Sequence, residues 1–209
     1  FWYESDTGKT FVYYDSYWVE IGGQGGPASP RLSMGYTSGA YYSIATPQHR
    51  SANTTTLSTL NRGFYVPFLV EEQTTFDRIA CHTNSTYSGT GSVRLGIYNN
   101  AGGKPTSLVL DAGTVSTTAS STTYAITINQ TLSAGWYWLV IVSQTVATTM
   151  AFVASTSITN VPNTRMDTSA TAAPTFLWYE SISGSLPSTA TPLSYGVSGN
   201  FPFVSLRVA

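Results

Sequence analysis

The sequence predicts an all-β protein: an antiparallel β-sandwich of jelly-roll-like type, preceded by a small β-hairpin module. Three observations predict this class. Short runs rich in aromatic and β-branched residues recur along the 209 residues, clusters of Gly, Ser, Asn and Pro separate them, and no run has the periodicity of an amphipathic helix. One large sandwich accounts for most of this length, because β-sandwiches often exceed the usual domain size without dividing.

The first predicted element is an aromatic β-hairpin module over residues 1–21. Its sequence, FWYESDTGKTFVYYDSYWVEI, places two aromatic runs around a turn at Thr7-Gly8-Lys9. A hairpin alone is marginally stable in water, so we expect it to pack on the following domain, an upstream segment or another subunit. Residues 22–35 then read as a Gly/Pro-rich linker with little apolar surface to bury.

The third predicted segment, residues 36–209, is the jelly-roll-like sandwich. Apolar residues alternate with others in Val93–Ile97 and in Tyr124–Ile128, so each of these strands is expected to bury one face. The predicted strands are Phe64–Val70, Phe76–His82, Val93–Tyr98, Leu108–Val115, Tyr124–Gln130, Trp136–Ser143, Met150–Ala154, Phe176–Glu180 and Phe203–Val208.

Three segments of this domain leave alternatives open. Trp136–Val142 is apolar on both faces, which indicates either a central strand covered by a loop or a strand that faces another subunit. Ser155–Pro174 and Ser181–Asn200 are predicted loops of unusual length. Long loops in compact domains are usually binding surfaces or disordered, and their Ser, Thr, Ala and Pro content suits both interpretations.

Composition excludes several classes of partner. Nine Lys or Arg residues against ten Asp or Glu give a net charge of −1, so the chain has no electrostatic footprint for nucleic acid. No apolar run approaches the length of a membrane span, and no membrane insertion is expected. The single cysteine, Cys81, allows no intrachain disulfide and is interpreted as a buried thiol. The absence of a signal peptide and of an initial Met predicts a fragment or a processed product.

The search for catalytic and metal-binding patterns predicts no enzyme and no cofactor. The acids are sparse, and only Glu180 has an aromatic neighbourhood, whereas hydrolysis by paired carboxylates needs two acids at a defined separation. His49 and His82 lack metal-ligand spacing. Oxygen atoms near Asn99, Asn100 and Asp111 could bind calcium, but a simple Asn/Gly turn also explains this pattern and is favoured.

Carbohydrate binding is the ligand chemistry that the composition supports best. Exposed Trp and Tyr rings can stack on the apolar faces of sugars, while neutral Asn, Ser and Thr groups bond to hydroxyls. Aromatic residues in β proteins mostly lie in the core, and Trp136 and Trp138 are assigned there. The rings nearest predicted loops, and therefore the candidate ligand-binding residues, are Trp178, Tyr179, Tyr195 and Tyr87.

Two stretches resemble known phage proteins. The opening segment is similar to short aromatic modules of tail and fibre proteins from tailed bacteriophages. Phe76–Ile79, Val93–Gly113 and Leu132–Leu139 together resemble a jelly-roll-like domain of phage tail and fibre proteins, with similar domains in bacterial extracellular proteins. The resemblance covers about half of the chain and implies a virion surface protein, commonly a homotrimer, that contacts other virion proteins and a glycan or protein of the host surface.

Three functions follow as expectations. The first is a phage fibre or tail structural protein whose distal sandwich attaches to the host surface, most simply through a glycan. The second is a purely structural decoration or connector protein of the virion with no receptor role. The third, a glycan-degrading sandwich enzyme, is disfavoured by the scarcity of placed acids.

Overall fold

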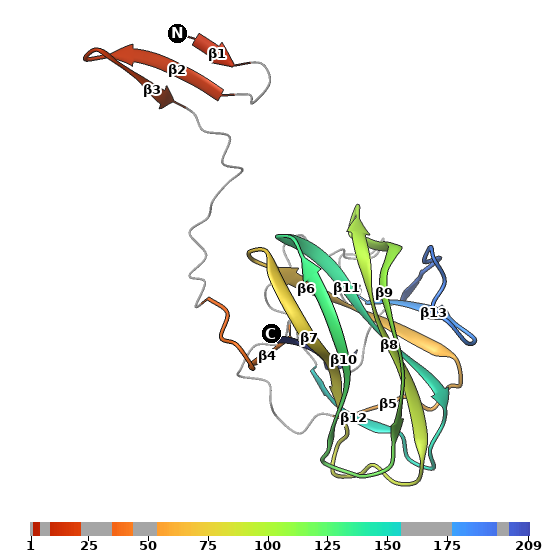
Figure 1. The fold of residues 1–209 in the computed structure, drawn as a ribbon. Coiled ribbons are helices and arrows are strands. Elements are labelled where there is room, and N and C mark those ends of the chain that lie inside the picture. The colour runs from red at the N-terminus through yellow and green to blue at the C-terminus, as the bar shows by residue number, and fades with distance from the viewer. Residues whose placement is uncertain (1, 5–8, 22–34, 44–53, 156–176, 196–200) are drawn as a thin grey trace, which may run out of the picture. The chain divides into compact units, whose positions relative to one another are not determined.

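The part of the chain that the structure describes consists of β-strands and connecting segments (Figure 1), which confirms the predicted all-β class. No helix long and apolar enough to cross a membrane occurs in the described part of the chain. The computed structural model describes residues 2–4, 9–21, 35–43, 54–155, 177–195 and 201–209. The chain divides into two compact units, Phe1–Gly35 and Tyr36–Ala209.

The first unit is a three-stranded antiparallel sheet instead of the single hairpin that the sequence predicted. Its strands are β1 (Trp2–Glu4), β2 (Lys9–Tyr14) and β3 (Tyr17–Ile21), in that order across the sheet. The second turn lies at Asp15-Ser16, where φ is 48° and 68°. Two consecutive left-handed residues make the tight turn whose twist suits a two-residue hairpin, and Asp tolerates this conformation better than most residues. Thr7 and Gly8 lie outside the described residues.

The second unit is an antiparallel β-sandwich, as predicted. Its two main sheets contain eight of the nine strands expected from the sequence together with two short edge strands. The four-stranded sheet has the order β10 (Thr123–Leu132), β7 (Thr74–His82), β16 (Val204–Val208), β4 (Tyr41–Tyr42). The six-stranded sheet has the order β14 (Leu193–Tyr195), β13 (Leu177–Ser181), β6 (Arg62–Val70), β11 (Gly135–Thr145), β8 (Gly91–Ala101), β9 (Lys104–Thr117). The ninth expected strand, β12 (Ala151–Ser155), lies in a third, small sheet between β15 (Phe201–Pro202) and β5 (Thr54–Thr56).

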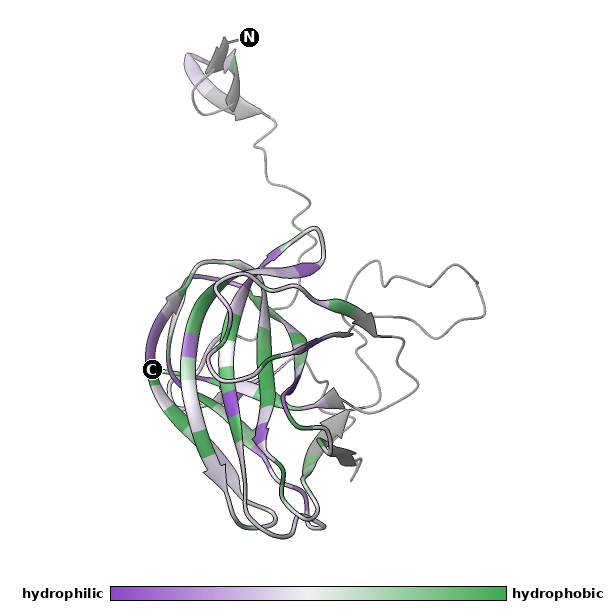
Figure 2. Cartoon of the chain, turned by 90° about the vertical axis from the view of Figure 1, so that its right-hand side faces the viewer, coloured by the Kyte–Doolittle hydropathy of each residue, from purple (hydrophilic) through white to green (hydrophobic). Residues whose placement is uncertain are grey.

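Successive strands of the second unit often lie in different sheets, and this connectivity is typical of a jelly-roll-like sandwich. β6 lies in the six-stranded sheet, β7 in the other, β8 and β9 return to the first, β10 crosses again and β11 comes back. Every pairing is antiparallel. Hydrophobic residues, green in Figure 2, are concentrated on the strands of this sandwich.

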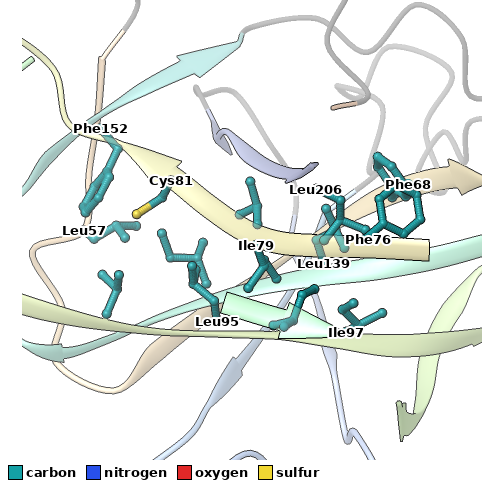
Figure 3. Close-up of a cluster of buried hydrophobic side chains, with 14 of the residues drawn as sticks. Leu57, Phe68, Phe76, Ile79, Cys81, Leu95, Ile97, Leu139, Phe152 and Leu206 are labelled. Carbon is teal, nitrogen blue, oxygen red and sulfur yellow. The ribbon is translucent and has the colours of Figure 1, made fainter. Parts of the chain in front are cut away.

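The main core lies between the two large sheets (Figure 3). Val93, Leu95 and Ile97 of β8 are fully buried in it, as their alternation predicted. Leu206 and Ile79 meet them from the opposite sheet, where their backbones are directly paired. Burial of side chains of this size provides about 1.5–3 kcal/mol each, so the cluster is the main source of stability for the sandwich.

A second apolar layer covers the outer face of the six-stranded sheet. Alternate residues of β11 enter different layers: Leu139 and Ile141 belong to the main core, and Val140 and Val142 belong to the second layer. The second layer is completed by residues 182–191, which we call the cover segment and which contribute Ile182, Leu186 and Ala190. The doubly apolar run therefore marks a central strand covered by a loop, the first of the two alternatives.

Candidate binding site

The cover segment shapes the surroundings of the candidate ligand-binding residues. Backbone hydrogen bonds join its later half to β9: Leu108 N donates to Ser188 O at 2.9 Å and Ala190 N donates to Thr106 O at 2.7 Å. The hydroxyl of Tyr98 donates to Pro187 O at 2.7 Å. Part of the predicted long loop Ser181–Asn200 is thus an ordered layer of the fold, whereas residues 196–200 and almost all of Ser155–Pro174 lie outside the described residues.

Tyr87 does not present its ring to a ligand. Its side chain is 5% exposed and belongs to the main core. Its hydroxyl lies 2.6 Å from the hydroxyl of Thr117 and donates to the carbonyl of the same residue at 2.9 Å. Sequence reasoning placed Tyr87 near a loop, which is correct for the backbone, but the ring turns inward because its hydroxyl finds partners there.

Trp178 is also a structural residue. It pairs with Tyr65 of β6 and its side chain, 9% exposed, lies in the second apolar layer. Its indole Nε1 donates to Gly103 O at 3.0 Å, at the tip of the β8–β9 hairpin. Lys104, the next residue, places its ammonium 5.1 Å from the centre of the Trp178 ring, within the range of a cation–π contact.

Of the predicted residues whose side chains the structure describes, Tyr179 is partly exposed, whereas Trp178 and Tyr87 are buried. Tyr179 pairs with Phe64 of β6 on one side and with Leu193 of β14 on the other, so the three side chains share a face. Tyr179 is half-buried, and Leu193 is 58% exposed. The guanidinium of Arg62 lies over the Tyr179 ring, 5.5 Å from its centre. We call the set Arg62, Tyr179 and Leu193 the β13–β14 edge.

The Tyr195 backbone belongs to the same ladder, where it pairs with Leu177 two positions from the Tyr179–Leu193 pair. Its side chain is outside what the structure describes. Three of the four predicted residues are therefore brought together on β13 and β14, and Tyr87 lies elsewhere. Sequence reasoning missed Arg62 and Lys104, because nothing local to either residue indicates a contact with a strand that follows much later in the chain.

Glu180 is the most deeply embedded acid near this edge. Its Oε2 accepts hydrogen bonds from the Tyr65 hydroxyl at 2.6 Å and from Thr191 N at 3.1 Å, and its Oε1 accepts one from the Thr191 hydroxyl at 2.8 Å. Burial, followed by the hydrogen bond to Glu180, raises the pKa of the Tyr65 hydroxyl above its usual value. The carboxylate holds the cover segment against the sheet and has little contact with solvent.

The other embedded acids also serve the fold. Asp111 accepts two hydrogen bonds from Nη1 of Arg94, at 2.8 and 2.7 Å, and a third from Leu186 N of the cover segment at 3.0 Å. Nε of Arg207 donates to Oδ1 of Asp77, a partly exposed acid, at 2.8 Å. These contacts bind carboxylates to fixed partners, an arrangement that favours stability over acid–base chemistry.

The side chains considered as calcium ligands, those of Asn99, Asn100 and Asp111, are hydrogen-bonded to protein groups. No group of three or more His, Cys, Asp or Glu that could hold a metal ion occurs among the described residues. Oδ1 of Asn100 accepts a hydrogen bond from Trp138 Nε1 at 2.9 Å, and the amide of Asn99 donates to Ser107 at 2.9 Å. The Asn/Gly turn that the sequence favoured over a calcium site contains Gly102 and Gly103, both with positive φ.

Comparison of the chain with models of known protein families, with curated proteins and with solved structures finds no match.

Proposed function

We propose that this chain is a non-catalytic attachment module of a bacteriophage fibre or tail, and that its sandwich binds a glycan of the host surface at the β13–β14 edge. The observation that carries the proposal is the Tyr179 ring, half-buried and held under the Arg62 guanidinium beside the exposed Leu193. A rigid aromatic ring with an adjacent apolar and hydrogen-bonding group is the arrangement that sugar recognition uses.

The roles of the embedded acids support binding over hydrolysis. Glycoside hydrolysis needs two carboxyl groups that flank the substrate, separated by about 5–10 Å. Glu180, the acid next to Tyr179, is buried and bonded to Tyr65 and Thr191. Asp111 is bonded to an arginine. An attachment role needs no such pair, and weak sites become effective when many copies bind together.

Binding to purified host-surface polysaccharides, together with competition against virus adsorption, tests the proposal. We expect the soluble chain to bind and to compete, and Tyr179→Ala and Leu193→Ser to weaken binding at least about tenfold, the loss expected when a central contact residue is truncated. Tyr41→Ala is the matched control, because Tyr41 is an exposed tyrosine beside Arg207 on the other sheet. If Tyr179→Ala and Leu193→Ser both bind the polysaccharide as tightly as the wild type, the β13–β14 edge is not the binding site.

A connector role is the second candidate, and a specific feature of the first unit favours it. Tyr13 and Trp18 are directly paired across β2 and β3 with ring centres 5.3 Å apart. Both rings are mostly exposed, as is that of Tyr17. Large exposed aromatic groups are typical of protein interfaces. The connector role predicts that Trp18→Ser abolishes incorporation into virions, whereas the soluble chain fails to compete for adsorption. The homotrimer remains a proposal, which light scattering of the full chain tests.

A further inference from the structure

Two cations flank the aromatic dipeptide Trp178-Tyr179. Arg62 lies over the Tyr179 ring and Lys104 lies near the Trp178 ring, on the opposite face of the strand. Neither cation forms an ion pair with an acid in the part of the chain that the structure describes, whereas Arg94 and Arg207 are each bonded to an aspartate there. Two positive charges thus lie beside β13, one on each face of the sheet, in a chain that has few charges.

Each cation follows a residue with positive φ whose backbone is hydrogen-bonded to another part of the sheet or its cover. Arg62 follows Asn61, whose φ is 60° and whose backbone is bonded on both sides, N to Ser143 O at 2.7 Å and O to Ile182 N at 2.7 Å. Lys104 follows Gly103, whose φ is 76° and whose carbonyl accepts the Trp178 indole hydrogen bond. Cations on fixed backbones lose less conformational freedom when they bind a ligand.

Glu180, the acid that follows this dipeptide, forms an ion pair with neither cation. Glu180 is buried, and its two carboxylate oxygens are directed at Tyr65 and Thr191. Among the described residues, two cations therefore lie near one buried carboxylate, and Arg62 is beside an aromatic ring and the exposed Leu193. An arginine with a free guanidinium fork matches carboxylate and phosphate groups, which it can bind with two hydrogen bonds.

We infer that the β13–β14 edge recognises an acidic glycan, one that carries carboxylate or phosphate groups. Arg62 of this edge, and Lys104 on the opposite face of β13, are the residues that select for the negative charge. This inference rests on the proposed function, since it names the chemical class of ligand for the same edge. The aromatic and apolar groups hold the sugar rings, and the cations attract the acidic substituents.

The test measures binding of the full chain to three polymers: polygalacturonate, which carries carboxylates, poly(glycerol phosphate), which carries phosphates, and neutral dextran. We expect at least one acidic polymer to bind about tenfold more tightly than dextran at low ionic strength, with the preference reduced by added salt. Which acidic polymer binds identifies the anionic group. Arg62→Gln combined with Lys104→Gln should lower this affinity about tenfold, in line with the loss of close charge pairs.

Arg78→Gln is the matched control, because Arg78 is an arginine near Asp77 on the other sheet. It should leave binding to the acidic polymer unchanged. The inference is overturned if neither acidic polymer is preferred to dextran, or if the double variant binds like the wild type. In either case binding of neutral host polysaccharides through Tyr179 would keep the proposed function, whereas failure of every polysaccharide to bind would remove both.

Discussion

Thr191 is bonded twice to Glu180, through its backbone N at 3.1 Å and its hydroxyl at 2.8 Å. Glu180 belongs to β13, just before the cover segment, and Thr191 is the last residue of that segment, so the carboxylate closes a loop of the chain over the second apolar layer. The Tyr65 hydroxyl, from the strand beneath, bonds the same carboxylate at 2.6 Å. One acid thereby joins the sheet to its cover.

Replacement of Glu180 should weaken the attachment of the cover segment to the six-stranded sheet. We expect Glu180→Ala to lower the free energy of unfolding by about 2–3 kcal/mol, because it leaves the buried Tyr65 hydroxyl and the Thr191 N–H without acceptors. Tyr65→Phe removes one donor and should cost about 1 kcal/mol. Urea denaturation measures both values. Amide exchange at Leu186 and Ala190 should accelerate in Glu180→Ala, and unchanged exchange there would contradict the role assigned to Glu180.

Gly96 allows the cover segment to approach the sheet. A Cβ at this position would lie 2.1 Å from Cδ1 of Leu186 and 2.6 Å from the carbonyl oxygen of Leu110. Since the carbonyl belongs to a paired strand and has no room to move, Gly96→Ala should destabilise the protein by at least about 2 kcal/mol. Gly102→Ala is the comparison, because a Cβ there meets no atom within 4 Å and the cost is only that of a φ of +58°, about 1 kcal/mol. Thermal unfolding of the two variants compares the costs, and equal losses would argue against close packing at Gly96.

Stability should fall at acid pH, partly through Asp111. Burial raises the pKa of Asp111, but the hydrogen bonds from Arg94, Leu186 N and Gly113 N outweigh it and hold this pKa below its usual value. A depressed carboxyl pKa contributes stability above the unfolded value, about 3.9, and that contribution is lost as the pH falls through the folded pKa. The free energy of unfolding should therefore decline below about pH 4.

Asp111→Asn provides the check on this assignment. It should be less stable than the wild type at neutral pH and should show a shallower decline on acidification. If the stability of Asp111→Asn falls as steeply at low pH as that of the wild type, the pH dependence comes from other carboxylates. Asp77 is one such group, because the hydrogen bond from Arg207 also lowers its pKa. Urea denaturation across the pH range measures the dependence.

Cys81 should be unreactive in the folded protein. Its thiol is buried in the main core, and burial raises its pKa to about 12. Since the thiolate is the reactive form, a disulfide reagent at pH 8 should label the native chain far more slowly than the unfolded chain, by at least about a hundredfold. Rapid labelling of the native protein would show that the strand β7 opens locally.

Local alternation was sufficient to predict the strands and the inward face of several of them. Val93, Leu95 and Ile97 face the main core because a strand turns successive side chains to opposite faces, a rule that needs no tertiary information. The same rule left β11 undecided, since a strand with apolar residues on both faces requires two covers and the sequence does not name the second.

The tertiary structure decided what lies on that second face and which residues meet at the candidate site. Leu186 and Ile182 cover β11, and Tyr65 reaches Glu180 across 115 positions of the chain. Arg62 reaches Tyr179 because β6 and β13 are neighbours in the sheet. Such contacts depend on strand order, which is set by the packing of the whole chain and leaves no local pattern. The sequence alone determines which side chains alternate along a strand, whereas the tertiary fold determines the partners of Glu180, Asp111 and Tyr179.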